Sequence, residues 1–196
     1  MHANGKLLFE KYAKPFFKSG MRVLEIGPDK HPSTNRAVVD EKAITWETLD
    51  IFNSDSLTHV AKDEYKFPVP DGTFDIVLST LVMEHVKKIW VWIREVARVC
   101  KRGGRVIMVA PTSWPYHPFP VDCWRIYSEG MRALYEEAGL TVELCKTETL
   151  EITDYKRLIP GKTCKPGKGG FKLFFRKLTR RKITCAFDTI AIGVKK

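Results

Sequence analysis

The sequence predicts an α/β fold in which a mostly parallel, doubly wound sheet has helices on both faces. Three apolar segments of strand length, residues 22–26, 44–50 and 74–79, are separated by stretches with helical patterns and turn residues. The first two carry acidic side chains at or near their ends, Glu25 and Asp50. Ligands of such sheets bind beyond the carboxyl ends of the strands, so this arrangement favours a nucleoside cofactor at that edge.

The N-terminal half is expected to alternate between short helices and strands. A helix before the first strand places four apolar residues on one face: Leu7, Leu8, Tyr12 and Phe16. Pro15 limits the length of this helix. Residues 27–43 contain a proline and few apolar side chains, so the first connecting helix should be short or irregular. A brief strand near 58–62 precedes a turn that ends at Asp71-Gly72.

The C-terminal half supplies two longer helices and three strands. The pattern predicts a helix over 87–101 that Gly103-Gly104 ends. Ser128 is expected to cap the next helix, and Gly139 is expected to end it. The inward face of this helix contains Met131, Leu134, Tyr135 and Ala138. The remaining strands span 105–110, 141–145 and 183–194.

Several motifs occur in the order that one enzyme family shows. They are Glu25-Ile26-Gly27 at the end of the first strand, Leu49-Asp50 at the end of the second, Phe74–Ser79 followed by Met83–Val86, and Arg94–Val99 followed by Lys101–Gly104. From residue 20 to about residue 145, the chain resembles the class I S-adenosylmethionine-dependent methyltransferases. The resemblance implies a Rossmann-like, doubly wound sheet of seven strands, mostly parallel, with an antiparallel last strand. It also implies S-adenosylmethionine as the cofactor.

The resemblance assigns roles to the carboxylates. Glu25 would lie near the methionine end of the cofactor, Asp50 would bind both ribose hydroxyls, and Asp63 would face the adenine amino group. The expected cofactor site consists of Glu25, Gly27, Asp29, Asp50, Ile51, Asp63, Glu64, Ser79 and Thr80. A solvated strand end is the alternative for each of the three carboxylates. Their occurrence at three successive strand ends favours the cofactor site.

The loop after the first strand departs from the family pattern. The family has three glycines in an acidic-x-Gly-x-Gly-x-Gly sequence, whereas this chain keeps Gly27 and has Asp29 and His31 at the other two positions. Aspartate adopts positive φ at modest cost, so Asp29 can still form the turn. A carboxylate there would repel the pyrophosphate of a dinucleotide, whereas it tolerates the sulfonium and ammonium groups of S-adenosylmethionine. NAD is therefore disfavoured.

The acceptor site is expected in the segment after the fifth strand, residues 112–127, which is rich in aromatic residues and prolines. The residues predicted to bind the substrate are Trp114, Tyr116, Asp122, Trp124 and Arg125. Their rings would stack on a sugar or another ring, and the alternative is that they only pack the loop. His117 is the first candidate for a general base, and His85 is the second. A structural histidine and a helix-start hydrogen bond at Glu84-His85 are the respective alternatives.

The charge of the chain is concentrated in one segment. Length and a hydrophobic content of 44% fit a single domain over residues 1–196, with a basic insertion at about 150–182 between the last two strands. The insertion has eleven Lys or Arg residues against Glu151 and Asp154, so it carries +9 of the net charge of +10. Phenylalanines at helical spacing in its second half, from Phe171 onward, predict a basic amphipathic helix.

The insertion suggests anionic partners. It would contact an anionic membrane surface or a phosphate-bearing acceptor such as a lipid-linked or nucleotide-linked sugar. RNA is the weaker partner, because no RNA-binding module is recognisable and the aromatic residues form one stripe. The alternative without a binding function is a solvated loop and a helix packed on the domain.

Several classes of protein and site are disfavoured by composition. Five widely spaced cysteines, without a Cys-x-x-Cys pair, indicate neither a zinc ribbon nor a disulfide framework. The five histidines lack the sequence spacing of metal ligands, so no metal is expected. No apolar run reaches about 18 residues. These features predict a cytoplasmic protein, with peripheral contact at the inner membrane surface through 150–182 as an option.

The combined expectation is an S-adenosylmethionine-dependent methyltransferase that acts on a hydroxyl of a small molecule or sugar, phosphate-bearing and lipid-linked acceptors included. The methyl group would move by in-line displacement, with most of the rate coming from positioning. Two alternatives stay open. One is an RNA methyltransferase that uses 150–182 as a phosphate track, and the other is a non-catalytic protein of this fold that binds an anionic partner.

Overall fold

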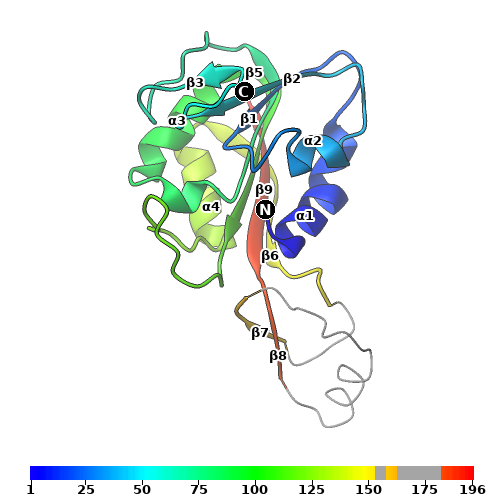
Figure 1. The fold of residues 1–196 in the computed structure, drawn as a ribbon, viewed down its shortest axis with the longest axis vertical. Helices are drawn as coiled ribbons and strands as arrows, with labels where there is room; N and C mark the ends of the chain where they lie inside the picture. Colours follow the sequence, from blue (N-terminus) through cyan, green and yellow to red (C-terminus); the bar gives the residue numbers. More distant parts are fainter. Residues whose placement is uncertain (153–157, 163–181) are drawn as a thin grey trace.

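The computed structural model describes residues 1–152, 158–162 and 182–196. Its centre is a seven-stranded sheet with the order β3-β2-β1-β4-β5-β9-β6 (Figure 1). The strands are β1 Arg22–Ile26, β2 Thr45–Asp50, β3 His59–Val60, β4 Phe74–Thr80, β5 Cys100–Pro111, β6 Leu140–Glu148 and β9 Asp188–Lys195. Strands β1 to β5 pair in parallel, whereas β9 runs antiparallel to β5 and β6. The predicted Rossmann-like sheet with an antiparallel last strand is confirmed.

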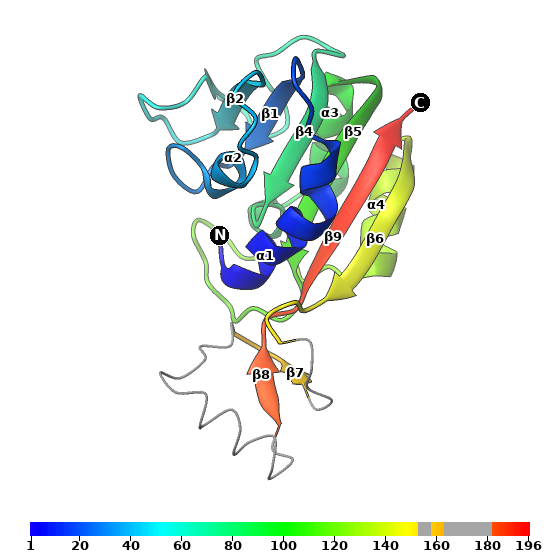
Figure 2. The same cartoon turned by 90° about the vertical axis from the view of Figure 1, so that its right-hand side faces the viewer.

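Helices cover both faces of this sheet (Figure 2). On one face lie α1 Ala3–Leu8, its continuations as a π-helix (η1, Phe9–Ala13) and a 3₁₀ turn (η2, Lys14–Phe16), and α2 Thr34–Val38. On the other face lie α3 Ile89–Val99 and α4 Ser128–Glu137. A 3₁₀ turn, η3 Met83–His85, follows β4. The doubly wound arrangement leaves the carboxyl ends of the parallel strands open to a ligand.

The central strands divide the core into two layers because successive side chains of a strand point to opposite faces. Ile76 and Leu78 of β4 belong to the layer that contains Phe9 of the N-terminal helix. Val77, which lies between them, belongs to the layer that contains Trp92 of α3. All five side chains are buried, and they fix β4 at the centre of the molecule.

Of the four residues predicted to face the core from the N-terminal helix, only Leu8 is fully buried. The buried residues are Leu8, Phe9, Ala13 and Phe17. Leu7, Tyr12 and Phe16, which were predicted to face the core, are only partly buried. Because α1 continues as a π-helix, its side chains do not follow the 3.6-residue repeat on which the prediction was based.

Gly103-Gly104 lie inside a strand and do not end a helix, since β5 begins directly after α3. A β-carbon on Gly104 would lie 2.9 Å from the carbonyl oxygen of Asp75 on the neighbouring strand. The register of β4 against β5 shifts between Phe74 and Ile76 at the same place. The glycines therefore accommodate an irregularity of the ladder, which periodicity alone does not reveal.

The prediction for α4 is right at the C-terminal end of the helix and wrong at its N-terminal end. Gly139 has φ +70° and its N–H donates to the carbonyl of Glu136 at 3.0 Å, so it ends the helix as predicted. The N-cap is Tyr127 and not Ser128. The hydroxyl of Ser128 donates to the carboxylate of Glu129 and leaves the backbone N–H groups of the first turn without a side-chain cap.

The predicted strand over 183–194 is divided in two. Its first part, β8 Ile183–Cys185, pairs with β7 Leu158–Pro160 in a separate two-stranded sheet, which projects beyond the main sheet in Figure 1. Phe187 separates β8 from β9, because its N–H and carbonyl bind the hydroxyl of Ser113 and the N–H of Thr112. The predicted amphipathic helix of the basic insertion lies outside the described residues. That the chain forms a single domain stays a prediction.

Candidate functional site

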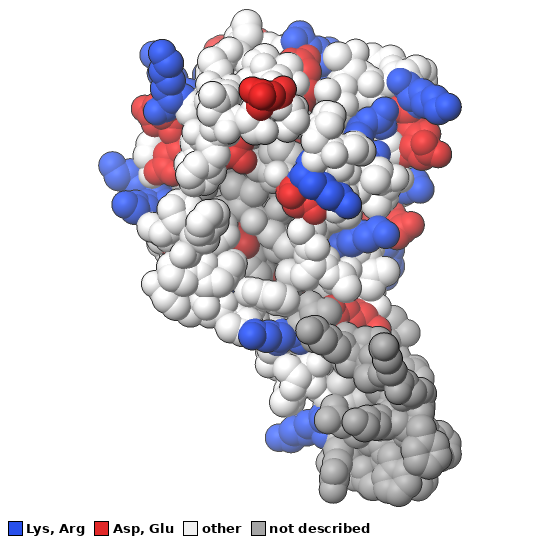
Figure 3. All heavy atoms as spheres, in the orientation of Figure 1, with Lys and Arg blue, Asp and Glu red and all other residues white. Residues whose placement is uncertain are grey.

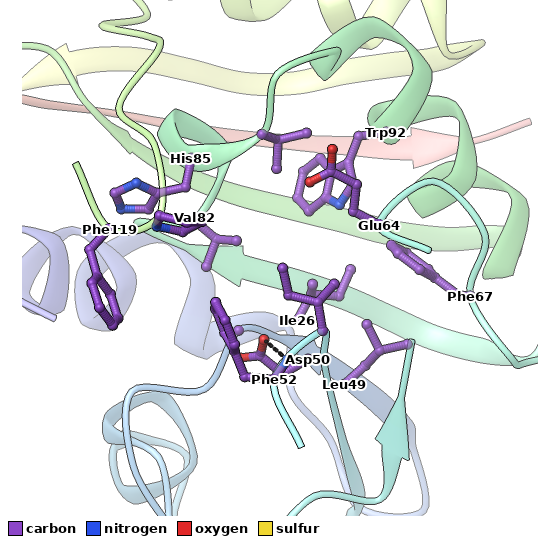
Figure 4. A pocket seen from close by; sticks show the side chains of 14 residues that line it. Ile26, Leu49, Asp50, Phe52, Glu64, Phe67, Val82, His85, Trp92 and Phe119 are labelled. Atoms are coloured by element: carbon purple, nitrogen blue, oxygen red, sulfur yellow. Dashed lines mark hydrogen bonds between the residues drawn. The ribbon is translucent and has the colours of Figure 1, made fainter. Parts of the chain in front are cut away.

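A cavity opens at the carboxyl ends of the parallel strands (Figure 4). Its wall comes from the ends of β1 and β2, the segment after β3, the turn after β4 and the segment after β5. In Figure 4, His85 and Phe119 lie toward one end of the cavity, whereas Glu64 and Phe67 lie toward the other. Ligands of open α/β sheets bind at this edge, so the cavity is the candidate cofactor site.

Gly27 forms the wall of the cavity at the end of β1. Its φ is +69°, a conformation that side chains rarely adopt, and its N–H donates to the carbonyl of Leu49 at 2.9 Å. A β-carbon at this position would lie 2.3 Å from Cγ2 of Val82. Backbone conformation and close approach therefore both require glycine here.

We expect Gly27→Ala to lower the free energy of unfolding by about 2–5 kcal/mol. The left-handed conformation costs about 1–2 kcal/mol with a β-carbon, and overpacking against Val82 costs about 1–3 kcal/mol. Urea denaturation of the purified variant measures the sum. The double variant Gly27→Ala/Val82→Ala should recover only the part of the lost unfolding free energy that is due to overpacking. A single variant as stable as the parent would show that the turn tolerates a side chain.

The turn after β4 contains a second unusual backbone conformation. Leu81 has φ +58°, which is rare for a bulky residue, and its N–H donates to the carbonyl of Val109 at 2.8 Å. The next residue, Val82, lines the cavity, and η3 follows at once. Strained backbone of this kind clusters at functional sites. The sequence carries no glycine or asparagine that would have indicated it.

Asp50 ends β2 and lines the cavity. Its Oδ1 accepts a hydrogen bond from the N–H of Phe52 at 3.1 Å, which orients the carboxylate at the strand end. The ring of Phe52 stacks on that of Phe119 with a centroid distance of 6.4 Å. These rings come from two different walls and are 54% and 80% exposed, so they stand at the mouth of the cavity. Ile51, between Asp50 and Phe52, also lines it.

Glu25 is buried behind the cavity and does not line it. Its side chain, in a residue only 1% exposed, accepts hydrogen bonds from Ser33, from Asn35 at 2.8 Å and from the indole of Trp46 at 2.9 Å. Burial raises the pKa of Glu25 more than these bonds lower it. Asn35 also donates to Thr80 at 2.6 Å. The carboxylate thus ties β1, α2, β2 and β4 together.

Three other expected cofactor residues stabilise turns and strands of the fold. Asp29 accepts from the N–H and the hydroxyl of Thr34 at 2.9 and 2.6 Å. These bonds and the N-terminal ammonium outweigh partial burial and lower the pKa of Asp29. Ser79 donates to the carbonyl of Ile26 at 3.0 Å. Asp63 is exposed and accepts from a backbone N–H two residues on.

The carboxylate that lines the cavity after β3 is Glu64, next to Asp63. The cavity therefore brings together Gly27, Asp50, Ile51 and Glu64 of the nine expected cofactor residues. The other five lie behind it or beside it. The sequence showed which strand ends carry acidic residues, whereas the direction of each side chain depends on the turns between them.

Asp122 and Arg125, both predicted to bind the substrate, form a bidentate ion pair. Arg125 donates to both carboxylate oxygens of Asp122 at 2.5 and 2.7 Å and also to the carbonyl of Trp114 at 2.7 Å. The guanidinium holds the pKa of Asp122 at about 2. The N–H of His117 is another donor to this carboxylate, at 2.8 Å. Both charged side chains therefore fix the shape of the loop.

Arg125→Ala should destabilise the protein by about 2–3 kcal/mol. The side chain of Asp122 is 1% exposed, and breaking a fully buried pair costs about 3–5 kcal/mol. We expect less because the Arg125 side chain is 24% exposed. The matched control is Arg105→Ala, which breaks the exposed pair with Glu143 and should cost under about 1 kcal/mol. Equal losses in thermal unfolding of the two variants would contradict the structural role.

The three aromatic residues predicted to bind the substrate lie outside the cofactor cavity. Trp114 stacks on His2 with a centroid distance of 4.5 Å, and Tyr116 is 74% exposed. Trp124 donates from its indole to the carbonyl of Val86 at 2.8 Å and lines a separate surface pocket between α3 and α4. From this segment, Phe119 and Pro120 reach the cofactor cavity instead. Neither was predicted, although both lie in the segment that the sequence indicated.

His85 and His117, the two predicted bases, meet beside the cavity. His85 lines it, and the two rings meet edge to face with a centroid distance of 5.0 Å. The N–H of Cys123 donates to the backbone carbonyl of Glu84 at 2.7 Å and so attaches the substrate segment to η3. Burial raises the pKa of Glu84 to about 8. One ligand-type atom from each of Glu84, His85 and His117 lies within 4.8 Å of the other two.

In the part of the chain that the structure describes, no helix has the length and apolar character needed to cross a membrane.

A family model described as a methyltransferase domain matches residues 11–108. No curated protein matches the sequence.

Several solved structures of similar fold are those of methyltransferases. A S-adenosylmethionine-dependent methyltransferase from Archaeoglobus fulgidus has a TM-score of 0.64 at 18% identity, covering 97% of this chain and 92% of that one. A putative methyltransferase from Haloferax volcanii, in complex with the Trm112 methyltransferase activator, has a TM-score of 0.60 at 20% identity, with coverages of 97% and 92%. Phosphoethanolamine N-methyltransferase 2 from Haemonchus contortus, in complex with S-adenosyl-L-methionine, has a TM-score of 0.61 at 14% identity, with coverages of 98% and 52%.

These structures share the fold, and the family model decides the family. Residues 11–108 span half of the chain and include β1 to β4. The same stretch contains Gly27, Asp50 and His85, which line the cavity. The family and the cofactor predicted from the sequence are thereby confirmed. The chain belongs to the methyltransferase domain family and is a S-adenosylmethionine-dependent methyltransferase.

Proposed function

We propose that this enzyme methylates a hydroxyl group of a small molecule or sugar. The observation that carries this proposal is the position of His85 in the wall of the cofactor cavity, with His117 against it. A hydroxyl becomes a good nucleophile when a neighbouring group removes or withdraws its proton. A neutral amine needs no such group, so paired imidazoles beside the cavity favour an oxygen acceptor.

The cofactor would occupy the cavity in one orientation. Asp50 accepts hydrogen bonds from the ribose hydroxyls, since its carboxylate is held at the end of β2 by Phe52. Glu64 faces the adenine amino group from the segment after β3. Gly27 lets the backbone approach the methionine end. The sulfonium methyl group then points toward His85.

The transfer is an in-line displacement. The acceptor oxygen forms a bond to the methyl carbon while the bond between that carbon and sulfur breaks. The electron pair of the broken bond stays on sulfur, which gives S-adenosylhomocysteine. The hydroxyl proton passes to an imidazole of the cluster that Glu84, His85 and His117 form. Phe52 and Phe119 narrow the mouth of the cavity and exclude water from the reacting groups.

The two alternatives are less well supported by the described residues. The RNA alternative depends on residues 150–182, most of which lie outside the described residues (grey in Figure 3), so it stays a prediction. Contact of 150–182 with an anionic membrane or acceptor stays a prediction. For a non-catalytic protein the altered glycine loop was the argument, yet Asp29 stabilises that loop through Thr34.

The proposal is tested by titration calorimetry with S-adenosylhomocysteine, followed by transfer of labelled methyl groups to a panel of acceptors. The panel pairs each sugar with its phosphorylated form and includes an amine and an RNA transcript. We expect micromolar binding of S-adenosylhomocysteine and label on a sugar or small-molecule hydroxyl. Label only on the amine or on RNA would overturn the acceptor class. Absence of cofactor binding would overturn the enzymatic proposal itself.

A further inference from the structure

Glu84, His85 and His117 have the composition of a transition-metal site. Two imidazoles and one carboxylate bind divalent zinc, iron, manganese or cobalt, and such three-residue sites leave coordination positions open for a substrate. Nε2 of His85 lies 3.9 Å from Oε1 of Glu84. One ligand-type atom of each residue lies within 4.8 Å of the other two. The fold has thus gathered three ligand residues beside the cofactor cavity.

The two imidazoles are oriented in the way that metal ligands are. Nδ1 of His85 donates to the carbonyl of Val121, and Nδ1 of His117 faces the carbonyl of Pro115 at 3.0 Å and the carboxylate of Asp122 at 3.1 Å. A proton held on Nδ1 by such an oxygen leaves the lone pair on Nε2. Hydrogen bonds from the second ring nitrogen to a carbonyl or carboxylate accompany almost all metal-bound histidines.

Glu84 supplies an independent indication. Its side chain is 2% exposed, and Oε2 has no hydrogen-bond partner in the described part of the chain. Buried carboxylate oxygens are normally satisfied, since an unpaired one costs free energy. The guanidinium of Arg125, which is near, is already paired with Asp122. A cation at the cluster would satisfy the orphaned oxygen.

We infer that Glu84, His85 and His117 bind a divalent first-row transition-metal ion, whose open coordination positions hold the acceptor hydroxyl beside the methyl group. The role of the ion in catalysis rests on the proposed function, whereas ion binding itself does not. Metal–ligand bonds of about 2.0–2.2 Å require the three side chains to move inward from their present separations.

The ion changes how the acceptor loses its proton. Coordination lowers the pKa of a bound hydroxyl, so the proton passes to solvent and the oxygen attacks as a metal-bound alkoxide. With the ion bound, His85 and His117 act as its ligands, in place of the role as bases that they would have without it. Sequence spacing gave no indication of this site, because the histidines belong to η3 and to the segment after β5.

The test is a titration of the chelator-treated, full-length protein with Co²⁺, followed by absorbance, and with Zn²⁺, followed by calorimetry. Neither measurement needs cofactor or acceptor. We expect one ion per chain, with visible bands from nitrogen and oxygen ligands. Glu84→Gln and His117→Gln should each weaken the affinity by at least the ~10–100-fold typical of losing a supporting residue. The matched control His59→Gln, at a histidine that contacts Glu47, should keep the affinity.

Thermal unfolding and S-adenosylhomocysteine binding are measured on the same samples. A zinc-dependent rise in melting temperature that both cluster variants lose, and His59→Gln keeps, supports the site. If the parent protein binds S-adenosylhomocysteine but no ion, or if both cluster variants bind Co²⁺ as the parent does, the inference is overturned and the proposed function stands. Ion binding without cofactor binding would leave the metal site and remove the proposed function.

Discussion

Replacing Asp50 by alanine is expected to remove measurable binding of S-adenosylhomocysteine. The carboxylate ends β2 in the wall of the cavity, and it would accept two hydrogen bonds from the ribose. Hydrogen bonds to a charged group contribute about 1.5–3 kcal/mol each, so the loss is about 3–6 kcal/mol, or at least a hundredfold in affinity. Calorimetric titration measures it directly.

The control for this variant is Asp50→Asn. An asparagine keeps an oxygen for the N–H of Phe52 and for one ribose hydroxyl, so its affinity should lie between those of the parent and the alanine variant. Both variants should unfold at the temperature of the parent within a few degrees, because Asp50 is only partly buried. Retained affinity in a folded Asp50→Ala protein would mean that the ribose lies elsewhere.

The sheet could be predicted from the sequence because its central strands follow simple rules. Residues 22–26 coincide with β1, and the brief strand near 58–62 contains β3. Apolar strands buried on both faces are recognisable from composition. The predictions that were wrong concern places where local patterns compete with tertiary contacts: Gly103-Gly104 looked like a helix end but accommodates an irregular strand pairing.

Which carboxylates line the cavity could not be predicted from the sequence. Periodicity places Glu25 and Asp50 at neighbouring strand ends, yet only Asp50 lines the cavity. Glu25 is enclosed by Ser33, Asn35 and Trp46, which come from the following loop, helix and strand. A sequence pattern specifies that a side chain occurs at a strand end. The neighbours that enclose it are determined by the path that the following loop, helix and strand take back to that strand end.

The histidine cluster could not be found from spacing for the same reason. His85 lies in η3, and His117 lies in a segment whose path depends on a few long-range bonds. The Asp122–Arg125 pair fixes this segment from within, and Cys123 attaches it to the backbone of Glu84. The sequence indicated both histidines as candidate bases, and that role stays a prediction. Their proximity is a property of the folded loop.

The variant His85→Gln is expected to lower kcat by about 10²–10⁴-fold while changing the affinity for S-adenosylhomocysteine only slightly. A group that assists proton removal contributes a factor of this size in the transition state. Because His85 lies at the end of the cavity away from Glu64, the proposed orientation of the cofactor keeps its imidazole apart from the adenine, and ground-state binding of the cofactor should persist. Single-turnover transfer of labelled methyl groups measures the rate, and calorimetry measures the affinity.

The companion variants decide whether the two histidines act as one unit. If they hold a common ion, His117→Gln should slow transfer as much as His85→Gln, and the double variant should be no slower than either. Residues that act together show this strong non-additivity. If the rate loss of the double variant equals the product of the two single losses, His85 and His117 have independent roles. The control variant His59→Gln should leave the rate unchanged. A rate unaffected by His85→Gln would remove the cluster from the chemistry altogether, because that imidazole is the member of the cluster that lines the cavity.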